Sequence, residues 1–212
     1  MGTAPRLDIY LVRHGVTRWN KEKRYLGHTD EPCMKERLDD LADLKSEMAG
    51  MEFDQVWTSD LLRCRETLHY LMPGVHPVTD KRLRECDFGN WEGKTYEDLK
   101  NLKDYRRWID HPQLQPIPAG ESWREFSGRL DEWLNDLLAG QEGVAAGRKT
   151  RALAVTHGGV IRYLVSVFRR SESFWHVTIR HGQALYLKLI YEGGKWTCNS
   201  LQAVPSAEKE EL

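Results

Sequence analysis

The sequence predicts an α/β fold, a three-layer α/β/α sandwich with a mostly parallel central sheet and helices on both faces. Two strand-like apolar runs, at residues 55–58 and 151–156, share one layout: a strand, a polar or charged group, then a helix. A third strand-like run lies at residues 9–12. With 212 residues and 40% hydrophobic content, the chain can bury one full core. We expect residues 1–205 to form a single domain, followed by a charged, frayed tail at 206–212.

The predicted strand at residues 9–12 is followed by a tripeptide whose side chains are suited to binding or transferring a phosphate. Residues 9–12 are apolar, and Arg13-His14-Gly15 follows at what would be the carboxyl end of the strand, the edge where open α/β sheets bind ligands. An imidazole beside a permanent cation and a glycine that lets backbone N–H groups come close can hold or accept a phosphate. The tripeptide alone is more simply explained as a chance match around a structural histidine, so the case depends on the rest of the chain.

A second copy of the tripeptide tests this interpretation. Arg180-His181-Gly182 precedes an alternating run at residues 184–191, so it begins a strand rather than ending one. That is the wrong context for a site at the carboxyl end of a strand. The alternating run and a second run at 195–201 predict an antiparallel hairpin at one edge of the sheet, with Gly193-Gly194 as its turn.

The strand at residues 55–58 lies between two predicted helices. Ser59-Asp60 is a plausible N-cap for the helix that follows, which places Arg63 in the first turn of that helix. The preceding helix is predicted by four apolar residues that keep helical spacing: Leu38, Leu41, Leu44 and Met48.

The second half of the chain repeats this layout. The strand at 151–156 ends at His157-Gly158-Gly159, ahead of an apolar helix. A loop at 82–93, rich in charge and glycine, lies between the two units and contains Glu85. Taken singly, each polar group has an ordinary explanation: a solvated arginine, a solvated glutamate or a structural histidine.

Together, these residues fit the chemistry of phosphate monoesters. A monoester carries nearly two negative charges, which Arg13, Arg63 and His157 at adjacent strand ends would match with charge-assisted hydrogen bonds. His14 would then lie within attacking distance of phosphorus, and a neutral imidazole can take the phosphoryl group to form a phosphohistidine. Glu85 is the best candidate to protonate the leaving alcohol, because a nearby phosphate dianion favours the protonated carboxyl group.

At this point the sequence resembles the histidine phosphatase (phosphoglycerate mutase-like) superfamily. The resemblance implies that His14 is the phosphorylated nucleophile, that Arg13, Arg63 and His157 form the phosphate pocket, and that Glu85 is the general acid. It also implies that Asn20 makes an additional phosphate contact. The motifs run in the family's order over roughly residues 8–190: Leu11-Val12-Arg13-His14-Gly15 with Trp19-Asn20, Ser59-Asp60-Leu61-Leu62-Arg63-Cys64 with Thr67, Leu83-Arg84-Glu85 with Phe88-Gly89-Asn90-Trp91-Glu92-Gly93, Gly120-Glu121-Ser122, and Val155-Thr156-His157-Gly158-Gly159.

The residues in these motifs are similar to those of the α-ribazole phosphatase and broad-specificity phosphatase branch. True mutases usually show Asn-Glu-Arg-His-Tyr-Gly around the acid, where this chain has Arg84-Glu85-Cys86-Asp87-Phe88-Gly89. The resemblance therefore implies a metal-independent phosphomonoesterase acting on a small phosphorylated metabolite, such as α-ribazole 5'-phosphate or a sugar or glycerate phosphate. Two alternatives stay open: a cofactor-dependent phosphoglycerate mutase, and a non-catalytic member that binds a phosphorylated ligand. Retention of Glu85 argues against the second, because a binding module has no need of an acid.

The middle of the chain contains the segment that we expect to select the substrate. Ser122 and Glu125 form a capping-box pattern that begins a helix, and an apolar stripe follows that we expect to be core: Trp123, Phe126, Leu130, Trp133 and Leu137. Residues 94–119 contain several aromatic side chains and three prolines without one long period. We expect short helices and a loop there, forming a cap over the strand ends that selects the alcohol part of the substrate.

Composition excludes several other classes. A net charge of −1 and a pI near 6.7 give no reason to expect a nucleic-acid partner, and no run approaches the ~18 residues of a membrane span. The four cysteines, Cys33, Cys64, Cys86 and Cys198, are too widely spaced for a paired-cysteine metal site, so we expect no metal, no cofactor and reduced thiols in the cytoplasm. Cys64 and Cys86 adjoin proposed catalytic residues, but the sequence does not tell whether either has a redox role.

Overall fold

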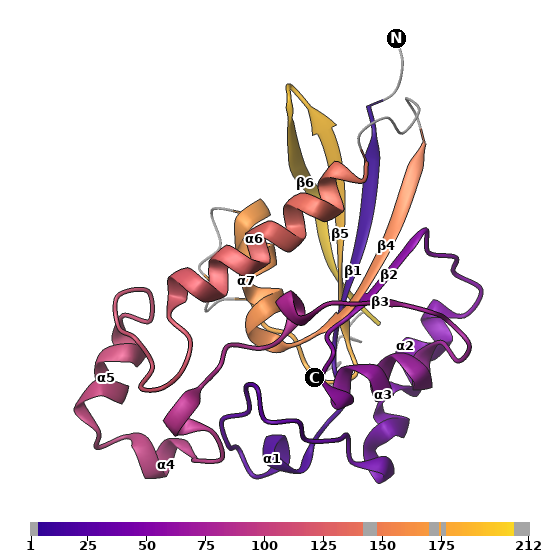
Figure 1. Cartoon of the computed structure of the whole chain (residues 1–212). Coiled ribbons are helices and arrows are strands. Elements are labelled where there is room, and N and C mark those ends of the chain that lie inside the picture. Colours follow the sequence, from indigo (N-terminus) through magenta and orange to yellow (C-terminus); the bar gives the residue numbers. More distant parts are fainter. Residues whose placement is uncertain (1–3, 142–147, 170–173, 175–176, 206–212) are drawn as a thin grey trace, which may run out of the picture.

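A computed structural model describes residues 4–141, 148–169, 174 and 177–205, and it confirms the predicted sheet. Six strands lie in the order β3-β2-β4-β1-β5-β6 (Figure 1). β1, β2, β3 and β4 are mutually parallel, whereas β5 is antiparallel to both β1 and β6. The strand bounds are Arg6–Arg13 (β1), Gln55–Thr58 (β2), Val78–Thr79 (β3), Lys149–Thr156 (β4), Ala184–Glu192 (β5) and Lys195–Val204 (β6).

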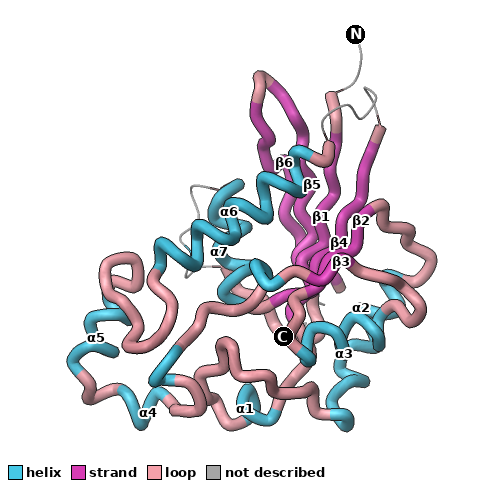
Figure 2. Tube along the Cα trace, viewed as in Figure 1, coloured by secondary structure: helices cyan, strands magenta, loops and turns pink. Residues whose placement is uncertain are grey.

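Helices cover both faces of the sheet, as Figure 2 shows, so the predicted three-layer arrangement is confirmed. α6 and α7 lie on one face, and α2 and α3 lie on the other. The bounds are Arg18–Lys21 (α1), Ala42–Met48 (α2), Leu62–Leu71 (α3), Tyr96–Leu99 (α4), Lys103–Asp110 (α5), Trp123–Ala139 (α6) and Gly158–Phe168 (α7). None of the helices in the described part of the chain is long and apolar enough to cross a membrane.

Side chains along β1 point alternately to the two faces of the sheet and contribute to a separate core on each. Leu7, Ile9 and Leu11 belong to the core under α6 and α7, whereas Tyr10 and Val12 belong to the core under α2 and α3. All five side chains are buried, which is the pattern of a strand covered on both faces. The strand that carries the Arg-His-Gly tripeptide is therefore fixed from both sides.

Two local predictions differ from the structure. The segment ahead of α2 is a 3-10 helix at Lys35–Leu41, which suits the spacing of three between Leu38, Leu41 and Leu44. The predicted Ser59-Asp60 N-cap of α3 is wrong, since Leu61 takes that position without a side-chain cap. The amide of Leu62 instead donates to Oδ1 of Asp30 at 2.6 Å, while Asp60 pairs with Arg84. A partner distant in sequence satisfies the helix end.

The hairpin and the capping box are confirmed. Gly193 and Gly194 turn β5 into β6 with φ of +60° and +80°, a left-handed conformation that glycine adopts without strain. Ser122 caps α6 in a capping box with Glu125, and four of the five residues in the predicted stripe are buried: Phe126, Leu130, Trp133 and Leu137. Trp123, the first, is only half-buried.

The predicted cap consists of α4, α5 and the loop that follows them. These elements lie at the end of the sheet where β1 ends, beside α1 (Figure 1). Three of their residues, Leu99, Tyr105 and Ile117, form a small separate core with Trp91 of the preceding 3-10 helix, Gly89–Trp91. The predicted tail at residues 206–212 lies outside the described residues.

Candidate active site

Two strand ends bring the first two predicted site residues together. β1 and β4 pair in register from Arg6 to Arg13, and the amide of His14 continues the ladder by donating to the carbonyl of Thr156 at 3.0 Å. The rings of His14 and His157 consequently lie with their centroids 5.0 Å apart. The parallel neighbours that the strand patterns predicted therefore place both histidines at one sheet edge.

His14 is arranged as a neutral nucleophile. It is only 4% exposed, and its Nδ1 lies 2.7 Å from the carbonyl oxygen of Gly15. Because a carbonyl only accepts, Nδ1 carries the proton and Nε2 keeps its lone pair. Burial, reinforced by the nearby Arg63 guanidinium, holds the pKa of His14 well below its usual value. The imidazole thus stays neutral at physiological pH, and a lone pair on Nε2 is capable of nucleophilic attack.

Arg13 supplies a buried cation beside this nucleophile. Its Nη1 donates to the carbonyl of Ile179 at 2.8 Å, whereas Nε is buried and has no hydrogen-bond partner among the described residues. Burial lowers the pKa of Arg13, yet a guanidinium remains charged in proteins. A buried donor without a partner is costly, so this geometry favours an anionic ligand at Arg13.

Arg63 is completely buried and held by three protein acceptors. Nη1 donates to the carbonyl of Thr29 at 2.8 Å, Nη2 to that of Gly27 at 2.6 Å, and Nε to Nδ1 of His157 at 3.3 Å. A guanidinium has five N–H groups, so two remain available for a ligand. The carboxylate of Glu92 accepts from the backbone amide of Thr29 at 2.8 Å, which fixes the loop that orients Arg63.

His157 has both ring nitrogens engaged by the protein. Nδ1 accepts from Arg63, and Nε2 lies 3.1 Å from Oγ of Ser59, so the proton is on Nε2. Burial holds the pKa of His157 well below its usual value, as does Arg63. His157 therefore orients the Arg63 guanidinium, and it reaches a phosphate only by exchanging one of these partners.

Glu85 lies at the N-terminus of α7. Its Oε2 accepts from the backbone amide of Gly159 at 2.9 Å, and its Oε1 accepts from the backbone amide of its neighbour Cys86 at 3.0 Å. The charge of Glu85 also acts on the buried guanidiniums of Arg13 and Arg63, so the carboxyl group belongs to the same electrostatic cluster. The loop predicted to carry the acid thus delivers a carboxyl group beside the cationic centre.

Asn20 takes part in the N-terminal cap of α1. It is the third residue of α1, and its Oδ1 accepts from the backbone amide of Thr17 at 3.1 Å while Thr17 caps the helix in return. This capping box uses the oxygen of the side chain and leaves the amide NH₂ as the group that can face an anion. The predicted phosphate contact of Asn20 stays a prediction.

The second Arg-His-Gly tripeptide lies beside the first, whereas its sequence context had placed it away from the site. It precedes β5 as predicted, yet Nδ1 of His181 lies 2.8 Å from the carbonyl oxygen of His14, and the two rings are 5.4 Å apart. β5 is antiparallel to β1, so its amino end lies at the same edge as the carboxyl end of β1. Burial lowers the pKa of His181 to about 4, which keeps this imidazole neutral too.

Comparison with known proteins shows the family to which the chain belongs. Residues 9–204 match the family model of the histidine phosphatase superfamily, branch 1. The chain belongs to this superfamily. The chain is 28% identical to a probable phosphoglycerate mutase GpmB of Enterobacter sp. (strain 638). The alignment spans 194 residues and covers 90% of this chain and 87% of that protein.

Solved structures agree on the fold. YhfR of Bacillus stearothermophilus has 26% identity and a TM-score of 0.76, covering 91% of this chain and 95% of that one. A putative alpha-ribazole-5'-P phosphatase of Escherichia coli K-12 has 24% identity and a TM-score of 0.78, covering 92% and 95% respectively. Phosphatase and mutase names therefore both occur among the relatives. Membership of the superfamily does not distinguish the two activities, so the distinction has to be argued from the site.

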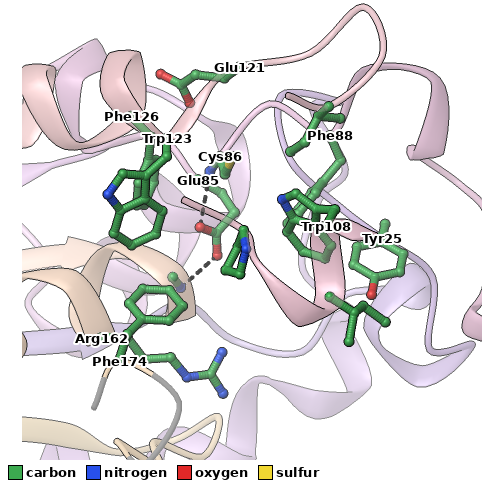
Figure 3. Close-up of a pocket in the computed structure, with 14 residues that line it drawn as sticks. Tyr25, Glu85, Cys86, Phe88, Trp108, Glu121, Trp123, Phe126, Arg162 and Phe174 are labelled. Atoms are coloured by element: carbon green, nitrogen blue, oxygen red, sulfur yellow. Dashed lines mark hydrogen bonds between the residues drawn. The ribbon is translucent and has the colours of Figure 1, made fainter. Parts of the chain in front are cut away.

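A cavity of about 530 Å³ borders Glu85 in this superfamily member (Figure 3). Trp108 of α5 lines it, so the predicted cap contributes to its wall, and Trp123 of α6 lines it on another side. Its charged lining residues are Glu85, Glu121 and Arg162. Six aromatic side chains form much of the rest: Tyr25, Phe88, Trp108, Trp123, Phe126 and Phe174.

Cys33, Cys64 and Cys86 form no disulfide with the described residues, and their surroundings disfavour the reactive thiolate. Cys64 is fully buried with its Sγ 3.4 Å from Nε2 of His157, and burial raises the pKa of both the Cys64 and Cys86 thiols. A protonated, buried thiol reacts slowly with oxidants. The described residues contain no group of three or more His, Cys, Asp or Glu side chains that could hold a metal ion.

Proposed function

We propose that this protein is a metal-independent phosphomonoesterase that works through a phosphohistidine at His14. The observation that carries the proposal is the Nε2 lone pair of buried, neutral His14 beside the Nε of Arg13, which has no hydrogen-bond partner in the described part of the chain. A nucleophile and a buried cation with spare donors are what transfer of a phosphoryl dianion requires. We also propose that the substrate is a small cytoplasmic metabolite.

In the first step, Nε2 of His14 attacks phosphorus as the bond to the leaving oxygen breaks. Arg13 and Arg63 stabilise the charge on the equatorial oxygens with the N–H groups that the protein leaves available. Glu85 gives its proton to the leaving alkoxide, so a neutral alcohol departs and a phosphohistidine remains.

In the second step, water hydrolyses the phosphohistidine. The Glu85 carboxylate, now deprotonated, takes a proton from the attacking water while the P–N bond breaks. The electron pair of that bond returns to Nε2 of His14, which releases inorganic phosphate and restores the starting site. The bond from Nδ1 to the Gly15 carbonyl fixes the tautomer throughout.

The cavity supports a phosphatase acting on an ester with an apolar, flat alcohol. Its wall is largely aromatic, and Glu121, one of its charged residues, is already paired with Arg129. Such a wall suits the aromatic part of a molecule like α-ribazole 5'-phosphate better than glycerate, which is small and anionic. One observation favours the mutase alternative: Arg162 in the lining is a cation that could bind a carboxylate.

The discriminating experiment compares phosphate esters at equal concentration. We expect inorganic phosphate to be released from α-ribazole 5'-phosphate and benzyl phosphate faster than from 3-phosphoglycerate, with no requirement for 2,3-bisphosphoglycerate. Trp108→Ala should raise KM for benzyl phosphate and leave methyl phosphate unaffected. Interconversion of 3- and 2-phosphoglycerate that depends on the bisphosphate would establish the mutase instead, and binding of these esters without turnover would establish the non-catalytic alternative.

A further inference from the structure

A single arginine on α6 holds the backbone segment that carries Glu85. Nη1 of Arg129 donates to the carbonyls of Arg82 at 2.5 Å and Arg84 at 2.7 Å, and Nη2 donates to the carbonyl of Glu85 itself at 2.9 Å. Arg82 lies in the short 3-10 helix Lys81–Leu83, whereas residues 84–88 belong to no helix or strand, so no regular ladder satisfies the carbonyl groups of Arg84 and Glu85. The guanidinium takes the place of that ladder.

The same guanidinium is fixed from its other side by Glu121. Nε of Arg129 donates to Oε1 of Glu121 at 2.6 Å, and Nη2 donates to Oε2 at 2.8 Å. This bidentate pair is largely shielded from solvent, with side chains 16% and 11% exposed. A planar fork with this geometry is specific to arginine, because lysine offers a point charge and cannot make both bonds together with three carbonyl contacts.

Glu121 extends the support beyond Glu85. Its Oε2 accepts from the backbone amide of Asp87 at 3.3 Å, and its own amide donates to the carbonyl of Asp87 at 2.9 Å. The segment is therefore held at residues 82, 84 and 85 by Arg129 and at residue 87 by Glu121. The backbone on both sides of Glu85 is tied to Arg129 and its partner.

We propose that Arg129, braced by Glu121, is a positioning residue that keeps the Glu85 carboxyl group in place to protonate the leaving oxygen. Arg129 does not line the cavity, so it acts through Glu85 rather than on the substrate. The proposal rests on the proposed function, in which Glu85 is the general acid. A displacement of about 1 Å at a catalytic group can cost about 10²-fold in rate, so the support decides the efficiency of the acid.

The test uses the leaving group as its readout. p-Nitrophenyl phosphate has a leaving group that needs little protonation, whereas an alkyl phosphate depends on the acid. Burst-phase kinetics isolates the phosphorylation step for both substrates. Arg129→Lys should slow phosphorylation by the alkyl phosphate by about 10–10²-fold and by p-nitrophenyl phosphate much less. Arg124→Lys on the same helix, where Arg124 is exposed, is the matched control and should affect neither substrate.

A double variant separates this proposal from the function on which it rests. In the Glu85→Gln background, Arg129→Lys should cause no further loss, because both changes act on one proton transfer. Equal losses for the two substrates in Arg129→Lys, or additive losses in the double variant, would overturn the positioning role. Equal losses in Glu85→Gln itself would instead remove Glu85 as the acid. If Arg129→Lys does not fold, Glu121→Gln replaces it. Because Glu121 lines the cavity, the phosphorylation rates are then compared at saturating substrate, where a change in substrate affinity does not enter, and the same outcomes support or overturn the positioning role.

Discussion

The backbone amide of Gly159 donates to Oε2 of Glu85 at 2.9 Å, which anchors the proposed acid on the first turn of α7. The contact is close enough that a side chain at residue 159 fits only if the Glu85 carboxyl group moves. A Cβ atom there would collide with Oε1 of Glu85 and lie 3.1 Å from its Cδ. Glycine at position 159 therefore lets the Glu85 carboxyl group lie against the first turn of α7.

Gly159→Ala should separate activity from stability. Alanine is a better helix former than glycine, by about 1 kcal/mol, so thermal unfolding should occur at an unchanged or higher temperature. The displaced Glu85 should nevertheless slow turnover of an alkyl phosphate by about 10²-fold. Gly128→Ala in α6 is the control, because a Cβ there meets no atom within 4 Å. Full activity in Gly159→Ala would mean that the position of the Glu85 carboxyl group does not matter.

Glu85→Gln tests the acid directly. Without a proton donor, phosphorylation by an alkyl phosphate should slow by roughly 10²–10⁴-fold, the range of general acid catalysis. p-Nitrophenyl phosphate should lose far less in the same burst-phase measurement, since its leaving group is stable as an anion. Equal losses would leave Asp87 or Glu92 as the next candidates for the acid.

The buried histidines should make the fold sensitive to mild acid. His181 titrates with a pKa of about 4 in the folded state and about 6.5 when unfolded, so the unfolded chain binds more protons between these values. Stability is full above about pH 6.5 and falls as the pH is lowered toward 4, by up to about 1.4 kcal/mol per pH unit for this group. Urea unfolding at pH 7.5 and 5.5 should show a smaller difference for His181→Asn than for the wild-type protein. Identical differences would contradict the shift.

Activity should survive chelation. Arg13, Arg63 and the N–H groups of the site provide positive charge for the phosphate without a metal ion. We therefore expect full turnover of p-nitrophenyl phosphate in excess EDTA. A loss that is restored by Mg²⁺, Mn²⁺ or Zn²⁺ would show that these groups are not the electrophiles.

Local sequence patterns predicted the parts of the site that lie at strand ends. The apolar run ahead of His14 and the strand-to-helix change at His157 are both short-range signals, and the structure brings these two residues together. The contribution of His181 was missed because it depends on β5 being antiparallel to β1, so that the start of one strand meets the end of the other. The predicted hairpin at the sheet edge could have indicated this neighbour.

Other features depend on contacts between distant segments and could not be predicted from local pattern. Asp30 caps the helix that carries Arg63 from 32 positions away, so the local Ser59-Asp60 pair was misassigned. Arg129 is an ordinary polar position on the helical pattern of α6, and its role emerges only when the loop around Glu85 is folded against it. Tertiary partners, rather than propensity, decide these positions.

The central claim is tested most directly by phosphoryl transfer to His14. The protein is incubated briefly with ³²P-labelled substrate, quenched in denaturant at alkaline pH, where phosphohistidine persists, and assayed for acid-labile label. His14→Ala should incorporate none and should not turn over, whereas His181→Ala, which loses the hydrogen bond to the His14 carbonyl and the ring contact with His14, should still be labelled. Acid-labile label that persists in folded His14→Ala would contradict the phosphohistidine mechanism.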